Sequence, residues 1–274
     1  MIKKIIHYCW FGGGKEPDSV KECIASWEKY CPNYEIIKWT EDTFDITCHP
    51  YMKEAYEHKK WAFVSDLARL LIIYKYGGVY LDTDVELIKN LDSIVDNNAY
   101  FFAIERFKHL REKGDSINIA TGLGFGAESG HVMVKALIDE YNGAHFIQDN
   151  GEFDCTPCPR RNSKALSRFG FNYEDKLLHI MDGTIYPSEY FCPIEFERGV
   201  SNFTSNTVSI HHYSGSWRSK EDIEKDEKLR QYISKYGNRC GRIFFSYYCT
   251  IIEDGLLGAI KLTKKYLIHL IELL

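Results

Sequence analysis

The segment WAFVSDLARLLIIYKYGGVYLDTDVELI, residues 61–88, constrains the fold more than any other part of the chain. Leucines and aromatic residues recur at helical spacing across residues 61–76, and a Gly-Gly pair follows, so we predict a helix that ends at the glycines. Apolar residues surround this helix on nearly all sides, which predicts that it is buried. Asp66 and Arg69 are costly on such a helix unless they pair with each other or face a cleft.

Two carboxylates stand directly after the next predicted element. Val79-Tyr80-Leu81 is typical of a short buried strand, and Asp82-Thr83-Asp84 follows it. Because residues two apart in an extended chain point the same way, both carboxylates face one point beyond the strand end. Ligands of open α/β sheets bind at that edge. Convergent carboxylates need a cation, and hard oxygen ligands suit Mg²⁺ or Mn²⁺ with a diphosphate completing the coordination sphere.

The alternation of strand and helix patterns predicts the fold class, which is α/β with a mostly parallel central sheet flanked by helices. Residues 3–9 and 34–39 are typical of strands, and residues 19–30 are typical of a helix. No internal repeat, low-complexity tract or linker divides the chain. The polar residues 143–165 are rich in turn formers and favour a loop over a site.

Composition and charge exclude two classes of protein. The chain has 274 residues, of which 45% are hydrophobic, so it is not intrinsically disordered. Its formal net charge of −5 lacks the basic excess of a dedicated nucleic-acid binder. Nine irregularly spaced cysteines and the absence of a secretory pattern indicate free thiols and a cytoplasmic protein. The lone pair Cys155-Thr-Pro-Cys158 lacks the further ligands of a zinc site.

The last twenty residues carry an amphipathic pattern. Apolar residues recur at helical spacing between Leu256 and Leu274, and this segment also contains a basic side made by Lys261, Lys264, Lys265 and His269. One interpretation is a helix docked on the core, and the other is a helix that lies on an anionic membrane surface. No run of uncharged apolar residues is long enough to span a membrane.

A strand followed by Asp-x-Asp is also found in haloacid-dehalogenase-like phosphatases, in which the first Asp accepts the phosphoryl group. Such enzymes usually carry this motif near the N-terminus and need a later acidic pair and a lysine. The run Met181-Asp182-Gly183-Thr184 lacks the nucleophilic Asp, because Ile180 stands in its place. A phosphatase is therefore the less favoured interpretation.

Several ordered motifs together point to a family. They are Ile5-Ile-His-Tyr-Cys-Trp-Phe-Gly12, Ser65-Asp-Leu-Ala-Arg69, Tyr76-Gly-Gly-Val-Tyr-Leu-Asp-Thr-Asp84, Thr184-Ile-Tyr-Pro-Ser-Glu-Tyr-Phe191 and Ser209-Ile-His-His-Tyr-Ser-Gly-Ser-Trp217. In this order they resemble glycosyltransferase family 32. That family groups sugar transferases with an Asp-x-Asp motif, including bacterial capsular and exopolysaccharide enzymes, and is similar to the glucosylating domain of large clostridial toxins.

The resemblance implies a GT-A fold over residues 1–218, with residues 219–274 as a helical extension packed on that domain or on a membrane surface. It also implies a nucleotide-sugar donor, a divalent metal (Mn²⁺ or Mg²⁺) and retention of anomeric configuration. The expected activity is hexosyl transfer, with UDP-galactose or UDP-glucose favoured as donor. The expected acceptor is a glycan or lipid-linked oligosaccharide in bacterial surface polysaccharide synthesis. A GDP-mannose-dependent mannosyltransferase is the alternative, and an inactive nucleotide-sugar-binding module is another.

The resemblance also assigns residues to the donor. Trp10 is expected to stack on the nucleobase, just beyond the first strand. Asp66 and Arg69 are expected to hold ribose and donor-sugar hydroxyls, Arg69 through its rigid fork of donors. Ser216 and Trp217 are expected to donate hydrogen bonds to the diphosphate.

At the metal, Asp84 is expected to bind directly and Asp82 to touch ribose or the metal through water. His212 is the expected third ligand, although adjacent strand residues point oppositely and His211 remains the other choice. Asp82, Asp84, Arg69 and Trp217 form the expected catalytic set, because negative charge grows on the leaving diphosphate.

Further residues are expected near the donor and the acceptor. Glu105 or Glu128 is a candidate to lie near the acceptor. The glycine-containing segment 118–130 is expected to line the sugar pocket.

Overall fold

The computed structural model describes residues 1–108, 115–194, 201–214 and 220–271, and its chain divides into two compact units. The first, called here the sheet unit, comprises Met1–Phe196 and Val200–Trp217. The second, called the helical unit, comprises Glu197–Gly199 and Arg218–Leu274.

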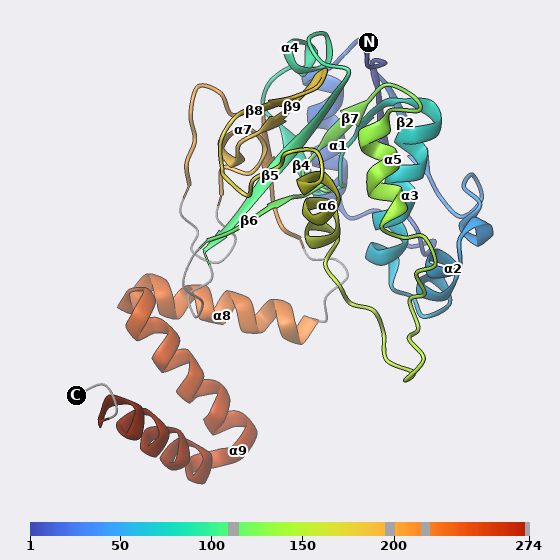
Figure 1. The fold of residues 1–274 in the computed structure, drawn as a ribbon. Helices are drawn as coiled ribbons and strands as arrows, with labels where there is room; N and C mark the ends of the chain where they lie inside the picture. The colour runs from blue at the N-terminus through green and yellow to red at the C-terminus, as the bar shows by residue number, and fades with distance from the viewer. Residues whose placement is uncertain (109–114, 195–200, 215–219, 272–274) are drawn as a thin grey trace. The chain divides into compact units, whose positions relative to one another are not determined.

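The sheet unit is built on an eight-stranded sheet in the order β2-β1-β3-β7-β5-β9-β8, with β6 paired to β5 (Figure 1). The strands are β1 (Ile5–Cys9), β2 (Glu35–Trp39), β3 (Gly78–Tyr80), β5 (Tyr100–Lys108), β6 (Asp115–Ile119), β7 (Phe125–Ala127), β8 (Leu178–Ile180) and β9 (Gly183–Tyr186). The pairings give β1, β2, β3, β5 and β9 one direction and the other three strands the opposite direction. The predicted α/β fold with a mostly parallel central sheet is confirmed.

Helices flank both faces of this sheet (Figure 1). They are α1 (Asp18–Tyr30), the 3₁₀ helix η1 (Ile46–Cys48), α2 (Pro50–Glu57), α3 (Trp61–Tyr76), α4 (Asp92–Val95), α5 (Val132–Asp139), α6 (Cys158–Ser167) and α7 (Ser188–Phe191). The hydrophobic core consists of two buried clusters, and neighbouring residues of a strand belong to different ones. Phe102 of β5 belongs to the cluster with α3, α5 and α6, and Phe101 belongs to the cluster with α1 and α4. Because strand side chains alternate between faces, the two clusters fill opposite sides of the sheet.

Helix α3 has the bounds that its periodicity predicts, and the glycines end it as expected. Gly77 and Gly78 have φ of 70° and 109°, values that favour glycine. A Cβ at Gly78 would lie 2.8 Å from the carbonyl oxygen of Ile5, so the close approach of β3 to β1 also requires glycine. The turn delivers the chain directly from a buried helix into a central strand.

A second, two-stranded sheet pairs β4 (Val85–Leu87) with β10 (Ser209–His211) in antiparallel register. Val85 lies opposite His211. Trp27 of α1 donates a hydrogen bond from its indole to the carbonyl oxygen of Val85 at 2.7 Å. This small sheet therefore joins the segment after Asp84 to a segment more than a hundred residues later in the chain.

The helical unit contains α8 (Lys220–Tyr236) and α9 (Asn238–Ile271). The helix predicted near the C-terminus is present but begins earlier, and α9 is interrupted at Gly255, whose φ of 67° and ψ of −166° are not helical. None of the described helices combines the length and apolar character that a membrane crossing requires. All nine cysteines are free of disulfide bonds, as their spacing predicts.

Candidate active site

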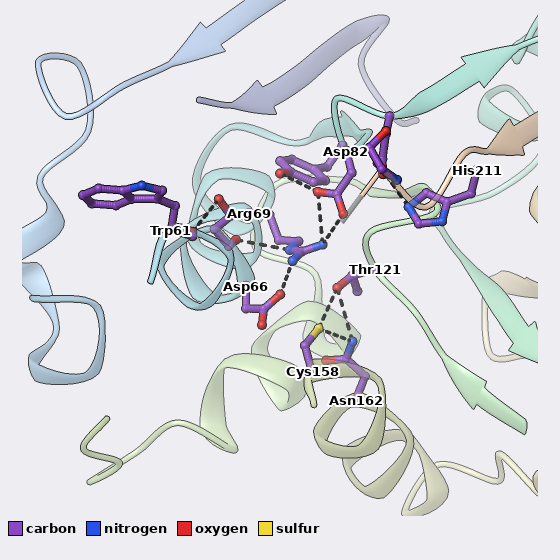
Figure 2. A network of polar contacts seen from close by, with 12 residues as sticks. Trp61, Asp66, Arg69, Asp82, Thr121, Cys158, Asn162 and His211 are labelled. Atoms are coloured by element: carbon purple, nitrogen blue, oxygen red, sulfur yellow. Dashed lines mark hydrogen bonds and ion pairs between the residues drawn. The ribbon is translucent and has the colours of Figure 1, made fainter. Parts of the chain in front are cut away.

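Arg69 joins two carboxylates that come from different elements (Figure 2). Its Nη1 donates to Oδ1 and Oδ2 of Asp82, at 3.4 and 3.3 Å, and its Nη2 pairs with Asp66 one turn earlier on α3. Its Nε donates to the carbonyl oxygen of Ser65 at 3.2 Å. Arg69 and Asp66 are buried, and Asp82 is partly exposed. The i, i+3 pair expected on α3 is therefore present, and it is extended to the end of β3.

Burial and ion pairing have opposite effects on the pKa values of Asp66, Asp82 and Arg69. Burial raises the pKa of Asp66 and of Asp82 above the usual range of a carboxyl, because one guanidinium does not fully compensate two carboxylates. Burial lowers the pKa of Arg69, but Asp82 and Asp66 outweigh it and hold that pKa well above its ordinary value. Arg69 is thus a fixed positive charge at the strand end.

The position of Asp82 is fixed by two further contacts. The Tyr80 hydroxyl donates to Oδ1 at 3.0 Å, and the Tyr80 ring lies 5.3 Å from the guanidinium carbon of Arg69. On the other side, the Asp82 backbone N–H donates to the carbonyl oxygen of Gly122 at 3.2 Å. A Cβ at Gly122 would overlap Oδ2 of Asp82 and lie 3.0 Å from Nη1 of Arg69, so only glycine fits there.

Asp84 is held by the last residue of β10 and by the segment that follows it. Its Oδ1 lies 3.1 Å from Nε2 of His211, and its Oδ2 accepts from the backbone N–H of Ser214 at 2.8 Å. Its carbonyl oxygen accepts from the His212 N–H at 2.9 Å. Burial opposes ionisation of Asp84, but His211 and the hydrogen bonds outweigh it and lower its pKa to about 2. Burial likewise opposes the charge on His211, yet Asp84 raises the pKa of that imidazole.

Asp82, Asp84 and His211 can hold a metal ion. One ligand atom from each residue can be chosen so that all three lie within 4.8 Å of one another, and no other group of three acidic, histidine or cysteine side chains among the described residues does so. Nδ1 of His211 is buried and has no hydrogen-bond partner. Two carboxylates and one imidazole fit a divalent cation of the Mn²⁺ or Mg²⁺ type, which prefers oxygen ligands.

The histidine in this cluster differs from the one favoured by the sequence. His212 points to Glu86, with Nε2 2.9 Å from Oε2, and is exposed. His211 lies opposite Val85 in the β4–β10 ladder, and side chains alternate along a strand, so only His211 reaches the carboxylates. The structure therefore places His211, the other alternative that the sequence left open, beside the two carboxylates, and places His212 beside Glu86.

Of the other residues predicted to contact the donor, the structure describes Trp10. Trp10 follows β1, packs against the cluster that includes α1 and donates from its indole to the carbonyl oxygen of Gly14 at 2.6 Å. In the same turn Gly12 packs directly on the indole of Trp61, which opens α3. Ser216 and Trp217 lie outside the described residues.

Glu105 occupies a buried position on β5 that the sequence suggested only weakly. The hydroxyl of Tyr213, two residues after His211, lies 3.3 Å from Oε1 of Glu105 and 2.8 Å from the Cys192 sulfur. Burial raises the pKa of Glu105 to about 7. Glu128, the other acidic candidate, pairs instead with the amino group of Met1.

A neutral polar network behind Asp66 was not foreseen from the sequence (Figure 2). Thr121 lies 3.4 Å from the sulfur of Cys158, and the Asn162 amide donates to both, at 3.2 Å each. Burial raises the pKa of Cys158 to about 12, so this cysteine of the Cys-x-x-Cys pair is a neutral thiol. The network attaches α6 to the segment that leads into Gly122. No local pattern signals it, because its members come from two distant segments.

A hollow lies beside the cluster of Asp82, Asp84 and His211. It is lined by Ser19, Glu22, Cys23, Glu86, His212 and Ser214. Its walls are thus α1, β4 and the segment after β10, and Ser214 also holds Asp84. Its lining combines the acidic side chains of Glu22 and Glu86 with His212 and Cys23.

The sequence comparisons both match glycosyltransferases. A family model described as a glycosyltransferase sugar-binding region containing a DXD motif matches residues 17–101. Inositol phosphoceramide mannosyltransferase 3 of Schizosaccharomyces pombe is 32% identical over 191 residues, 67% of this chain and 42% of that protein. The chain therefore spans less than half the length of this relative.

Among solved structures, the PaToxG glycosyltransferase aligns with a TM-score of 0.42 and 15% identity, over 61% of this chain and 69% of that one. A glycosyltransferase involved in glycosylation of the major capsid of PBCV-1 aligns with a TM-score of 0.41 and 15% identity, over 81% of this chain and 97% of that one.

Proposed function

Since the chain carries the DXD-containing sugar-binding region of glycosyltransferases, we propose that it is a retaining, metal-dependent hexosyltransferase that uses a nucleotide sugar. The observation that carries the proposal is the convergence of Asp82, Asp84 and His211 beside the Arg69 guanidinium. The catalytic domain is proposed to be residues 1–218.

In this proposal the three ligand side chains bind Mn²⁺ or Mg²⁺. The ion, when bound, neutralises the charge that develops on the leaving diphosphate. Asp84 is preorganised for this role, because its lowered pKa keeps it ionised at every physiological pH. Arg69 and Asp66 orient donor hydroxyls, and Trp10 stacks on the base. Ser216 and Trp217 remain proposed diphosphate contacts.

The proposed donors differ both in their sugar and in their nucleotide. UDP-galactose or UDP-glucose is the favoured donor from the family resemblance. The name of the fission yeast relative describes a mannosyltransferase, which supports GDP-mannose as the alternative donor. A panel of nucleotide sugars distinguishes the two, because only the cognate donor releases its nucleoside diphosphate at an appreciable rate.

For the acceptor, we propose a hydroxyl of a glycan or lipid-linked oligosaccharide in bacterial surface polysaccharide synthesis, at the cytoplasmic face of the membrane. The hollow lined by Glu22, Glu86 and His212 is suited to a sugar hydroxyl, because it offers hydrogen-bond acceptors next to the ion-binding cluster. His212 then belongs to acceptor binding rather than to the metal.

The test is donor hydrolysis across a panel of nucleotide sugars, with Mn²⁺, with Mg²⁺ and with a chelator. The parent should release nucleoside diphosphate from one donor only when a divalent ion is present, and Asp84→Asn should abolish the release. The control variant is Asp149→Asn, which changes an exposed aspartate in a loop and should match the parent. Tight donor binding without turnover would support an inactive binding module. Phosphate release from para-nitrophenyl phosphate that depends on Asp82 would support a phosphatase.

A further inference from the structure

Large aliphatic side chains are exposed where α9 bends. Leu256 and Leu257 are 75% and 74% exposed, Ile252 is 64% exposed and Ile260 is 54% exposed. Together with Ile251 they form a group called here the bend tip. Single exposed aliphatics are ordinary on protein surfaces, but here five are exposed within ten residues, and concentrated apolar exposure is typical of interaction sites.

The bend that presents this patch is a built feature. Gly255 leaves the helical conformation, with φ of 67°, and the two halves of α9 then fold back beside each other. The Tyr247 hydroxyl donates to Oγ1 of Thr263 at 2.9 Å, which ties the two halves together. A Cβ at Gly258 would overlap Asp254 and lie 3.0 Å from Cγ2 of Thr250, so the halves approach closely near the bend. The tip is therefore held at the end of a helical hairpin.

Charge identifies the kind of surface that the tip fits. After the bend, α9 carries three lysines and no acidic residue up to residue 265, whereas Glu253 and Asp254 directly precede Gly255. Lys261 and Lys264 follow the tip directly and are exposed. The aromatic side chains in the preceding half of α9 pack on α8, Phe244 on Tyr236 and both Phe245 and Tyr248 on Tyr232. Aliphatic side chains beside lysines are typical of segments that bind the interface of an anionic bilayer.

We propose that the bend tip inserts into the headgroup region of an anionic lipid bilayer. Binding of this kind lies in the membrane interface. The lysines contribute attraction to the anionic headgroups, and the aliphatic tip contributes burial in the acyl boundary. The inference rests on the helical unit alone and stands whether or not the proposed sugar transfer is correct.

This location refines the membrane interpretation made from the sequence. The sequence suggested one amphipathic helix from residue 256 onward. In the structure the most exposed aliphatics flank Gly255 on both sides, so the inserting element is the hairpin end and includes Ile251 and Ile252.

The experiment is vesicle flotation with the full chain. One set of vesicles contains phosphatidylcholine alone, and the other contains about one third phosphatidylglycerol as the anionic lipid. The parent should float with the anionic vesicles, and less so as salt is raised. The double variant Leu256→Ser/Leu257→Ser should bind them at least roughly tenfold more weakly. The variant Lys261→Glu/Lys264→Glu should lose the preference for anionic lipid.

The matched control is Leu177→Ser/Met181→Ser, which removes two exposed apolar side chains from the sheet unit and should bind like the parent. Helix content by circular dichroism verifies that each variant folds. Equal flotation of the parent and Leu256→Ser/Leu257→Ser would overturn the proposal. It would also be overturned by a parent dimer in light scattering that this variant converts to monomer, because the tip would then be covered by a second copy of the chain.

Discussion

Substitution of Gly122 by alanine tests whether the position of Asp82 sets the activity. The new Cβ would overlap Oδ2 of Asp82 and lie 3.2 Å from its Cγ. To restore ordinary contact, the carboxylate oxygen must move by about 1 Å. Its hydrogen bonds with Arg69 are already 3.3 and 3.4 Å long, so a movement of this size breaks them.

The expected stability cost of Gly122→Ala is about 1–3 kcal/mol, as for overpacking at other close contacts. The expected loss of nucleoside diphosphate release is roughly 100-fold, because displacements of about 1 Å at a reacting site have effects of that size. Release from the cognate donor with Mn²⁺ measures activity, and urea unfolding measures stability.

Gly143→Ala separates the two effects. Gly143 has φ of 70°, and no other group lies within 4 Å of the place that an alanine methyl would occupy, so alanine there strains the backbone without touching Asp82. This control should lose stability and keep the activity of the parent. If Gly122→Ala retained activity within about twofold of Gly143→Ala, the reasoning that close contact fixes a catalytic Asp82 would be refuted.

Three other predictions concern the charged groups. His211→Ala should weaken Mn²⁺ binding, measured by calorimetry, at least roughly tenfold. His212→Ala should leave Mn²⁺ binding unchanged and raise the KM for the acceptor. Weaker Mn²⁺ binding in His212→Ala but not in His211→Ala would make His212 the ligand. Arg69→Lys should fold but lose roughly 100-fold in donor turnover, because a lysine does not bridge two carboxylates; turnover near that of the parent would contradict the bridging role. Because the pKa of Glu105 is raised from 4.5 to about 7, the folded state binds the extra proton, and the free energy of unfolding should fall as pH rises from about 4.5 through 7. Glu105→Gln should flatten this dependence in urea unfolding at several pH values, and the exposed control Glu152→Gln should not.

The parts of the fold that local pattern controls were predictable. Helix α3 and the strand after it follow from apolar spacing and from the Gly-Gly stop, and the structure reproduces the helix bounds. Asp82 and Asp84 lie together as predicted, but they do so in the turn between β3 and β4, which the Val85 N–H closes on the Asp82 carbonyl oxygen, and not in extended chain. These features depend on residues that are close neighbours in the sequence.

The parts that depend on distant pairing were not predictable. The choice between His211 and His212 is set by the register of β10 against β4, which adjacent residues alone do not specify. Glu105 stands in an apolar strand, and its raised pKa depends on burial by segments far along the chain, including Tyr213. The break at Gly255 was missed because apolar spacing continues across it in the sequence.

The pairing of β4 with β10 also sets when the candidate metal site is completed during synthesis. Asp82 and Asp84 leave the ribosome more than a hundred residues before His211. At about 5–20 residues per second, the acidic pair waits on the order of ten seconds without its imidazole partner. A nascent chain in that interval has two of the three candidate ligands, and the third joins them only when the late segment pairs with β4. Synthesis of the last quarter of the chain is therefore the step that supplies the third candidate ligand, through the pairing of β10 with β4.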